Sequence, residues 1–282
     1  MSLAILRAAA VLYALSAVLY VGYFSRPRHA RLAVGGFWFL SAAFVVHAVA
    51  IGAGCHEFGG KEFFSLRGSI VLAAWLAAGA YLLLQRLYRV PSVGAFVLPL
   101  LLLALVPAAL ADPGHPEVPP EVVRHAALHV MAAILAVALF AIAFGVAVMY
   151  LLQEREVKGK RFGPFFFRLP SLDALDRLNQ RLVRAGFVAF TIALVAGTLN
   201  AAVVWKSAWS WDPQQIVSVG VWLLYGAMVE LRHQGWHGRR YAVLTLVGFL
   251  VLAGAMGTFQ AFPNATRHAG DFGTLGAAGG AR

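Results

Sequence analysis

The sequence predicts an all-α polytopic membrane protein, a bundle of about eight transmembrane helices. Two features of its composition support this class: 61% of the 282 residues are hydrophobic, and only 12% are charged. A soluble domain carries roughly 25% charged residues. The third observation is that the apolar residues gather in stretches of roughly 20, the length needed to cross about 30 Å of hydrocarbon as a helix.

Eight stretches have the required length. We expect helices near 3–24, 34–54, 66–85, 91–111, 126–152, 184–204, 214–231 and 241–261. The fourth stretch contains Pro91, Pro99 and Pro107, which predicts a bent or interrupted helix. The first stretch is interrupted by Arg7 and its basic flank follows it, so we interpret it as a retained helix rather than a signal peptide.

The longest connection, about 153–183, is too short to fold as a separate domain. Within it, four leucines recur at helical spacing: Leu172, Leu175, Leu178 and Leu182. They predict an amphipathic helix that lies on the membrane surface before the sixth span begins. We therefore expect one membrane domain over 1–265, followed by a disordered Gly- and Ala-rich tail over 270–282.

The distribution of cations predicts the orientation. If all eight stretches cross the membrane, sixteen of the 23 Lys and Arg residues fall on one side. The positive-inside bias makes that side cytoplasmic, so both termini are predicted outside and the chain is placed in the cytoplasmic (inner) membrane. The net charge of +11 then reflects membrane topology, and no nucleic-acid partner is predicted.

The cysteine content excludes one class of function. Cys55 is the single cysteine, so it cannot form a disulfide within the chain. The sequence also contains no C-x-x-C-H haem-attachment motif, so the chain is not itself a c-type cytochrome.

A Trp-rich run, WKSAWSWDP over 205–213, occupies the outward connection between the sixth and seventh stretches. Its indoles, Trp205, Trp209 and Trp211, are suited either to an interfacial aromatic belt or to stacking on a flat apolar ligand. Asp212 and Pro213 have a local explanation as the N-cap and first residue of the next helix. Gln215 would complete a capping box there, leaving Asp212 an indirect role in orienting the indoles.

Two outward histidines flank the Trp-rich run, His129 before it and His268 after it. Each has a cation nearby, Arg124 or Arg267, and Lys206 lies within the run. Imidazoles ligate haem iron, cations pair with propionates, and indoles cover a porphyrin face, so this set is suited to a haem clamp. The alternative is that the cations snorkel, the indoles form a belt and the histidines are hydrated, and spacing alone leaves both open.

His47 falls in the middle of the second stretch. An ionisable residue at membrane depth is costly and often functional. One interpretation is a neutral imidazole hydrogen-bonded to a hydroxyl on a neighbouring helix. The other is a haem ligand within the bilayer.

The run WKSAWSWDPQQ resembles the WWD motif of cytochrome c assembly membrane proteins of the CcsA-type and HemX-type branch. The stretches LPSLDALDRLNQRLVRAGF and GWHGRRYAVLTLVGFLV are similar to helices of that family, over about 121–268. The resemblance implies that His129 and His268 ligate iron of a transiently bound haem b. It also implies that haem is presented to apocytochrome c at the outer membrane face, with a partner membrane protein, as the haem-handling subunit of a cytochrome c synthetase rather than a free-standing enzyme.

The chain also departs from that family. Lys206 stands where the family usually has Gly, and Gln214 and Gln215 replace a Lys-Glu pair. Glu230 stands where synthetase members carry a second intramembrane histidine, which would leave His47 without its partner. These differences favour a divergent or HemX-type member, and they leave open an alternative function as a membrane regulator of tetrapyrrole biosynthesis.

Overall fold

The computed structural model describes residues 2–26, 28–59, 61–88, 90–111, 120–160, 169–204 and 207–261. These parts of the chain form eight α-helices and two short 3₁₀ helices, with no strand among them. The helices are α1 (Ser2–Ser25), α2 (Ala30–Phe58), α3 (Leu66–Tyr88), α4 (Gly94–Leu110), α5 (Pro120–Lys158), α6 (Leu172–Val204), α7 (Pro213–His233) and α8 (Arg239–Ala261). The 3₁₀ helices are η1 (Lys61–Phe64) and η2 (Pro91–Val93).

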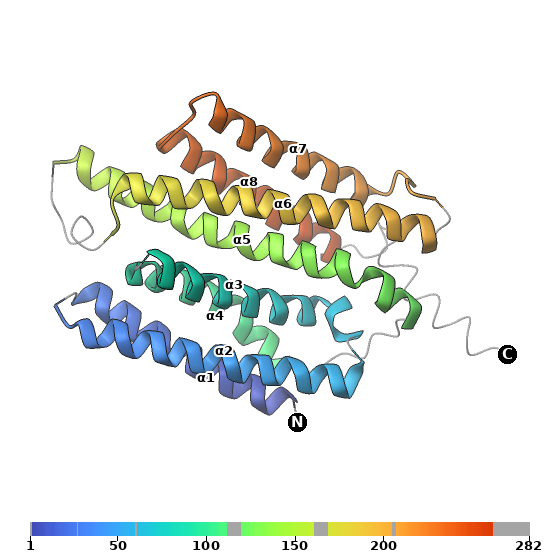
Figure 1. Ribbon diagram of the computed structural model, residues 1–282, viewed down its shortest axis with the longest axis horizontal. Coiled ribbons are helices and arrows are strands. Elements are labelled where there is room, and N and C mark those ends of the chain that lie inside the picture. The colour runs from blue at the N-terminus through green and yellow to red at the C-terminus, as the bar shows by residue number, and fades with distance from the viewer. Residues whose placement is uncertain are drawn as a thin grey trace.

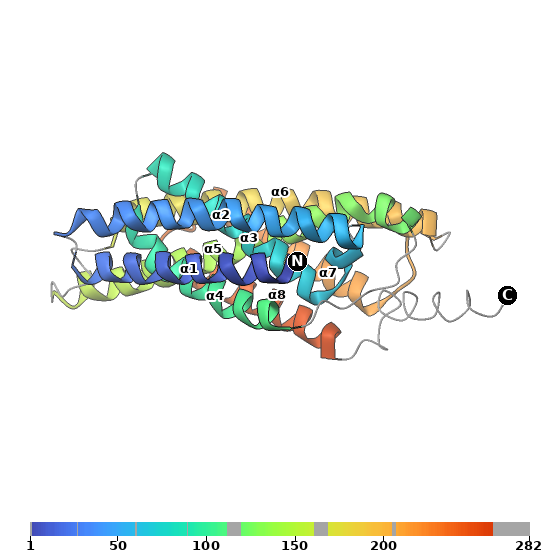
Figure 2. The same ribbon diagram turned by 90° about the horizontal axis from the view of Figure 1, so that it is seen from below.

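All eight α-helices are long and apolar enough to cross a membrane, which confirms the predicted all-α, multi-pass class. They run along one long axis, and consecutive helices are antiparallel (Figures 1 and 2). Helices α1–α4 form one half of the bundle and α5–α8 the other (Figure 1). Helix α5, with 39 residues, packs against α6 and α8 of its own half and against α3 of the other.

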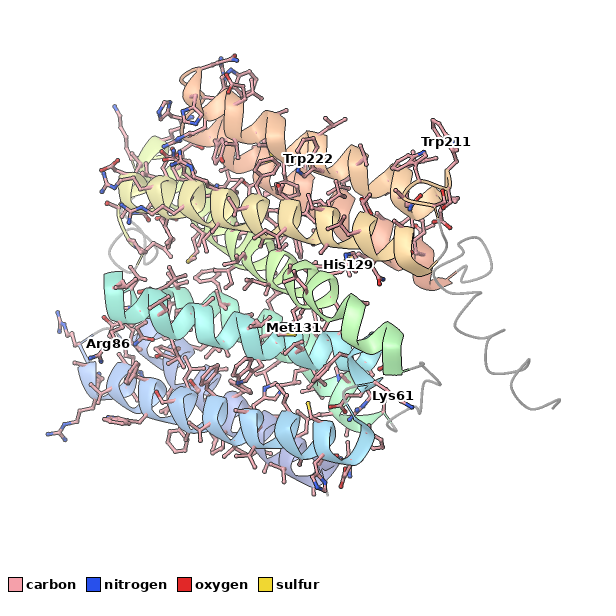
Figure 3. The ribbon with its side chains drawn as sticks, turned by 45° about the vertical axis from the view of Figure 1, so that its right-hand side comes forward. Lys61, Arg86, His129, Met131, Trp211 and Trp222 are labelled. Carbon is pink, nitrogen blue, oxygen red and sulfur yellow. The ribbon has the colours of Figure 1, made fainter. Side chains whose placement is uncertain are left out.

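The two ends of the bundle differ in charge. The connections that follow α1, α3, α5 and α7 gather at one end, called here the basic end, which carries Arg28, Arg86, Lys160 and Arg239. The start of α1, the connection between α6 and α7 and the last turn of α8 lie at the opposite end (Figure 1). Arg86 and Trp211 mark these two ends in Figure 3. The cations therefore segregate along the bundle axis as the sequence predicts.

Helices α5 and α6 pack closely because small residues on α6 admit large side chains from α5. A Cβ added at Gly186 would lie 2.5 Å from the Phe140 ring, and one added at Gly197 would lie 2.6 Å from the His129 imidazole. The two pairs have the same register, eleven residues apart on each helix in opposite directions. Glycine at both places lets the helix backbones approach, as in other membrane helix pairs.

The start of α6 differs from the sequence prediction. The expected surface helix does not precede the sixth span, because residues Leu172–Val204 form one continuous helix of 33 residues. Three of the four leucines that suggested an amphipathic helix are buried: Leu175, Leu178 and Leu182. Helix α5 continues to Lys158 and packs against α6, and these leucines are buried in the protein core instead of facing a membrane surface.

Helix α4 agrees with the prediction in part. The interruption is confined to η2 at Pro91, and the helix from Gly94 to Leu110 includes both Pro99 and Pro107. Arg67 donates to the carbonyl of Ala108 at 2.8 Å, near the C-terminus of α4. A cation at this position also interacts favourably with the helix dipole.

An ion pair joins helices α6, α7 and α8 at the basic end of the bundle. The Arg232 guanidinium donates to both carboxylate oxygens of Asp176, at 2.9 and 2.6 Å, joining α7 to α6. Gly238 N–H donates to the same carboxylate at 3.0 Å, which adds the start of α8. The Arg232 guanidinium also lies 5.3 Å from the Tyr241 ring centroid. Both charged side chains are largely buried, so the pair fixes the relative positions of three helices.

Candidate functional site

His129 lies between α5 and α6, and a hydrogen bond determines its proton position. Its Nδ1 is 2.7 Å from the backbone oxygen of Ala193. Because a carbonyl oxygen only accepts, Nδ1 must carry the proton and donate it. In the neutral ring the lone pair is then on Nε2, the atom that remains available to a metal ion.

The imidazole occupies a space that Gly197 leaves open. A Cβ there would lie 2.6 Å from Nδ1 and 2.8 Å from Cε1 of His129, closer than carbon approaches these atoms in real structures. Gly197 belongs to a stripe of small residues at every fourth position on α6, with Ala189, Ala193 and Ala201. Sequence reasoning missed this stripe, although the small-x-x-x-small spacing is a recognisable sign of close helix contact.

His129 and Trp211 lie toward the same end of the bundle (Figure 3). Gly197 is seven residues before the end of α6 at Val204, a rise of roughly 10 Å. The chain then enters the Trp-rich run. The structure describes residues 207–212 of this connection, called here the Trp loop. Along the axis of α6, the His129 imidazole is therefore about two helical turns from Val204, the last residue of that helix.

Two indoles of the Trp loop are solvent- or lipid-accessible. Trp211 is 75% exposed and Trp209 is 39% exposed. Their rings meet edge to face, with centroids 5.6 Å apart and planes at 84°. Trp211 has a φ of +56°, a left-handed backbone conformation that non-glycine residues rarely adopt. The loop thus holds a large apolar ring outward at a conformational cost.

Side-chain hydrogen bonds hold the Trp loop in this shape. The Asp212 carboxylate accepts from Gln214 N–H at 2.9 Å, so Asp212 is the N-cap of α7 and Pro213 its first residue. This confirms the predicted capping role. Gln215 makes a different contact from the one expected, because its Oε1 accepts from the Ser210 backbone N–H at 3.0 Å and from the Ser210 hydroxyl at 3.1 Å. It therefore braces the loop rather than completing a capping box.

Three predicted site residues fall outside the described residues: Trp205, Lys206 and His268. The side chain of Arg124 also falls outside them, as does the tail over 270–282. The structure therefore places His129, Trp209, Trp211 and Asp212 of the proposed clamp. The second histidine of the clamp stays a prediction.

His47 lies in the other half of the bundle. Its side chain is fully buried, with Nδ1 3.3 Å from the Tyr13 hydroxyl of α1 and the two rings edge to face at 5.7 Å. Its Nε2 has no hydrogen-bond partner among the described residues. Of the two interpretations given for His47, a neutral imidazole hydrogen-bonded to a hydroxyl on a neighbouring helix is the one that this contact with Tyr13 matches. Iron ligation by His47 stays a prediction.

Comparison with known proteins identifies the family. The family model described as "Cytochrome C assembly protein" matches residues 63–259. This match begins at η1, well before the region of resemblance in the sequence, and it includes His129 and the Trp loop but not His47 or His268.

Curated relatives agree with the family model. The cytochrome c biogenesis protein CcsA of Prochlorococcus marinus (strain NATL2A) is 28% identical over 67% of this chain and 70% of its own length. The protein of the same name from Parasynechococcus marenigrum (strain WH8102) is 28% identical over 70% of this chain and 73% of its own. That of Porphyra purpurea is 40% identical over 30% of this chain and 27% of its own.

A solved structure shares the fold. The cytochrome c heme lyase CcmF superposes with a TM-score of 0.60 at 17% sequence identity, covering 95% of this chain and 50% of that protein. The chain thus spans half the length of CcmF, and the likeness concerns the helix arrangement alone. The family model spans more than half of the sequence, and the two CcsA proteins from cyanobacterial strains NATL2A and WH8102 align with about two thirds of this chain. This membrane protein therefore belongs to the cytochrome c assembly protein family.

Proposed function

We propose that the chain binds haem at the end of the bundle that carries the Trp loop and presents it to apocytochrome c. The observation that carries this proposal is the His129 imidazole, held by the Ala193 carbonyl in the space beside Gly197. An imidazole with its Nδ1 proton bonded to a carbonyl is a well-oriented ligand for iron through Nε2. Such a ligand suits a haem that must be bound in one orientation.

The Trp loop supplies the second feature of the proposed site. Trp209 and Trp211 offer exposed indole faces toward the same end as His129, and such faces can cover a porphyrin and exclude water from it. We assign Trp205 to the same wall and His268 to the second iron ligand. Asp212 acts indirectly, because its cap on α7 fixes where the loop ends.

The bound group is proposed to be haem b, held transiently, since a delivery protein must release it. The haem is the group that the C-x-x-C-H motif of an apocytochrome receives. We propose a partner membrane protein in the same complex, a location in the cytoplasmic membrane and both termini outside. The names of the relatives, a cytochrome c biogenesis protein and a cytochrome c heme lyase, support this assignment.

The test is haem retention by the detergent-purified protein. His129→Ala should lose most of the bound haem, and exogenous imidazole should restore part of the absorption spectrum by occupying the vacated ligand position. His56→Ala is the control, because His56 is an exposed histidine near the end of α2, at the same end of the bundle. If His129→Ala keeps the wild-type spectrum, His129 is not a ligand.

A second variant tests the geometry without removing the ligand. Gly197→Ala places a methyl group against the imidazole, so we expect haem affinity to fall about 10- to 100-fold, the usual effect of disturbing a ligand's support. Gly220→Ala is the matched control, because a Cβ there meets no atom within 4 Å. Equal haem affinity in the two variants would show that the imidazole position does not matter.

Deletion of the gene separates this function from the tetrapyrrole-regulating alternative. Loss of c-type cytochromes with normal levels of the early tetrapyrrole enzyme is the expected result. The reverse pattern would contradict a role in haem presentation.

A further inference from the structure

Asn200, in the last turns of α6, carries a side-chain amide with no hydrogen-bond partner in the part of the chain that the structure describes. Its Oδ1 is buried and unpaired. Its Nδ2 donates to no described residue and is not fully buried. An unpaired buried oxygen costs the folded protein stability, and native proteins that keep one usually have a functional reason for it. The amide is therefore a candidate for contact with a ligand.

Asn200 lies on the strip of α6 that holds the His129 imidazole. It follows Ala193, whose carbonyl oxygen accepts from His129 Nδ1, by seven residues, and it follows Gly197 by three. Residues seven apart on a helix point in nearly the same direction, and residues three apart are neighbours on one face. Helical side chains lean toward the N-terminus of their helix, so the Asn200 amide is directed toward the turn that contains Gly197. That turn is where the imidazole lies.

The surroundings of Asn200 between α5 and α6 are apolar. The register of the two helices, set by the contacts of Gly186 with Phe140 and of Gly197 with His129, places Ala126 opposite Asn200. Ala126 is buried, and so is Ala201, the next residue on α6. Methyl groups offer no hydrogen bond to an amide. A partner for the amide must therefore come from water or from a bound ligand.

We propose that the Asn200 amide donates a hydrogen bond to a propionate of the haem that His129 ligates. This inference rests on the proposed function. The propionates are the anionic groups of haem, and an amide N–H can donate to a carboxylate without placing a charge between apolar helices. A hydrogen bond to an ionised acceptor is also about twice as strong as one between neutral groups.

The contact gives Asn200 a positioning role. A single imidazole ligand leaves the porphyrin ring free to rotate about the bond between iron and Nε2. A second contact, at one propionate, fixes which edge of the ring faces the end of the bundle that carries the Trp loop. A haem that is passed to another protein benefits from one defined orientation, because the reacting groups must meet in a fixed geometry.

The experiment titrates the full chain in detergent with haem and, separately, with haem dimethyl ester, in which both propionates are esterified and uncharged. Absorption spectra give the two affinities. We expect Asn200→Leu to weaken haem binding about ten-fold, the usual effect of losing a hydrogen bond to a charged group, and to leave the affinity for the ester unchanged. Equal weakening for both ligands would overturn the proposal, because the amide would then not act on the propionate.

Thermal unfolding of the haem-free protein separates this role from a structural one. Asn200→Leu removes an unpaired amide, so its unfolding midpoint should equal or exceed that of the wild type. A lower midpoint would show that the amide has a partner in the folded chain, which would overturn the proposal.

Two further variants complete the test. Thr198→Val is the matched control, because Thr198 is an exposed polar residue of the same turn whose hydroxyl donates to the Leu194 carbonyl of its own helix. It should bind haem and the ester as the wild type does, and weakening equal to that of Asn200→Leu would overturn the proposal. His129→Ala should lose both ligands, since the iron is common to them. If it does and Asn200→Leu binds haem normally, this inference alone is wrong. If His129→Ala keeps both ligands, the proposed function is wrong and this inference with it.

Discussion

Trp211 combines a large exposed ring with a backbone conformation that favours glycine. The left-handed region costs a residue with a Cβ roughly 1–2 kcal/mol. The indole recovers little of this by burial, because 75% of the residue is exposed. Strained residues of this kind persist where the surrounding structure determines them, and they gather at functional sites. We infer that Trp211 is held for contact with a ligand rather than for the stability of the loop.

This inference predicts different effects from two substitutions at one position. Trp211→Ala and Trp211→Gly both remove the indole, so each should lower haem affinity, about two- to ten-fold for the loss of one aromatic contact. Trp211→Gly also relieves the backbone strain, so it should unfold at a higher temperature than Trp211→Ala, by about 1 kcal/mol in stability. Haem titration and thermal unfolding in detergent check the two effects. Wild-type haem affinity in both variants would leave Trp211 as a belt residue.

His129 and Gly197 show what the sequence can and cannot predict at this scale. A histidine toward the same end of the bundle as a Trp-rich run was recognisable from residue type and order along the chain. Its support was not, because Ala193 and Gly197 are more than 60 residues away and meet His129 only through the register of α5 against α6. The positive φ of Trp211 could not be predicted either, because the residue at that position is not glycine or asparagine, the types that usually adopt this conformation.

At the scale of elements, the start of α7 determines where the Trp loop ends. Asp212 is buried and its carboxylate caps Gln214 N–H, so the loop joins a helix with a defined first turn. Helix starts of this kind are predictable because Asp followed by Pro has a local physical cause. The continuous α6 was not predictable in the same way. The same leucine spacing serves a helix on lipid headgroups and a helix packed on the extension of α5.

The cap predicts a contrast between two variants of Asp212. Asp212→Ala removes the acceptor and should cost about 1 kcal/mol, with faster hydrogen exchange at the Gln214 amide by roughly five-fold. Asp212→Asn keeps an equally good N-cap and should leave that exchange rate close to wild type. Hydrogen exchange read by mass spectrometry over the first turn of α7 distinguishes them. Faster exchange of the same size in both variants would show that the carboxylate charge matters, not the cap.

At the scale of the whole molecule, the bundle separates two kinds of chemistry along its long axis. The indoles of the Trp loop lie at one end, with His129 toward it, and the arginine-rich connections lie at the other (Figure 3). An even number of antiparallel helices also puts the start of α1 and the last turn of α8 at the Trp-loop end (Figure 1). If all eight helices span the membrane, the two ends of the bundle lie on opposite sides of it. An experiment that shows which side one end faces therefore also shows which side the other end faces.

The positive-inside bias predicts that the Trp-loop end faces outward, and cysteine labelling tests this. Cys55→Ser removes the native thiol, after which Ser210→Cys reports on the Trp loop and Lys160→Cys on the basic end. With a membrane-impermeant maleimide, we expect Cys at position 210 to be labelled on intact spheroplasts. Cys at position 160 should be labelled only after the spheroplasts are permeabilised. Exposed Lys160 serves as the internal control, because both sites lie outside the spanning helices. The opposite pattern would place the His129 end in the cytoplasm, where it could not deliver haem to an apocytochrome outside.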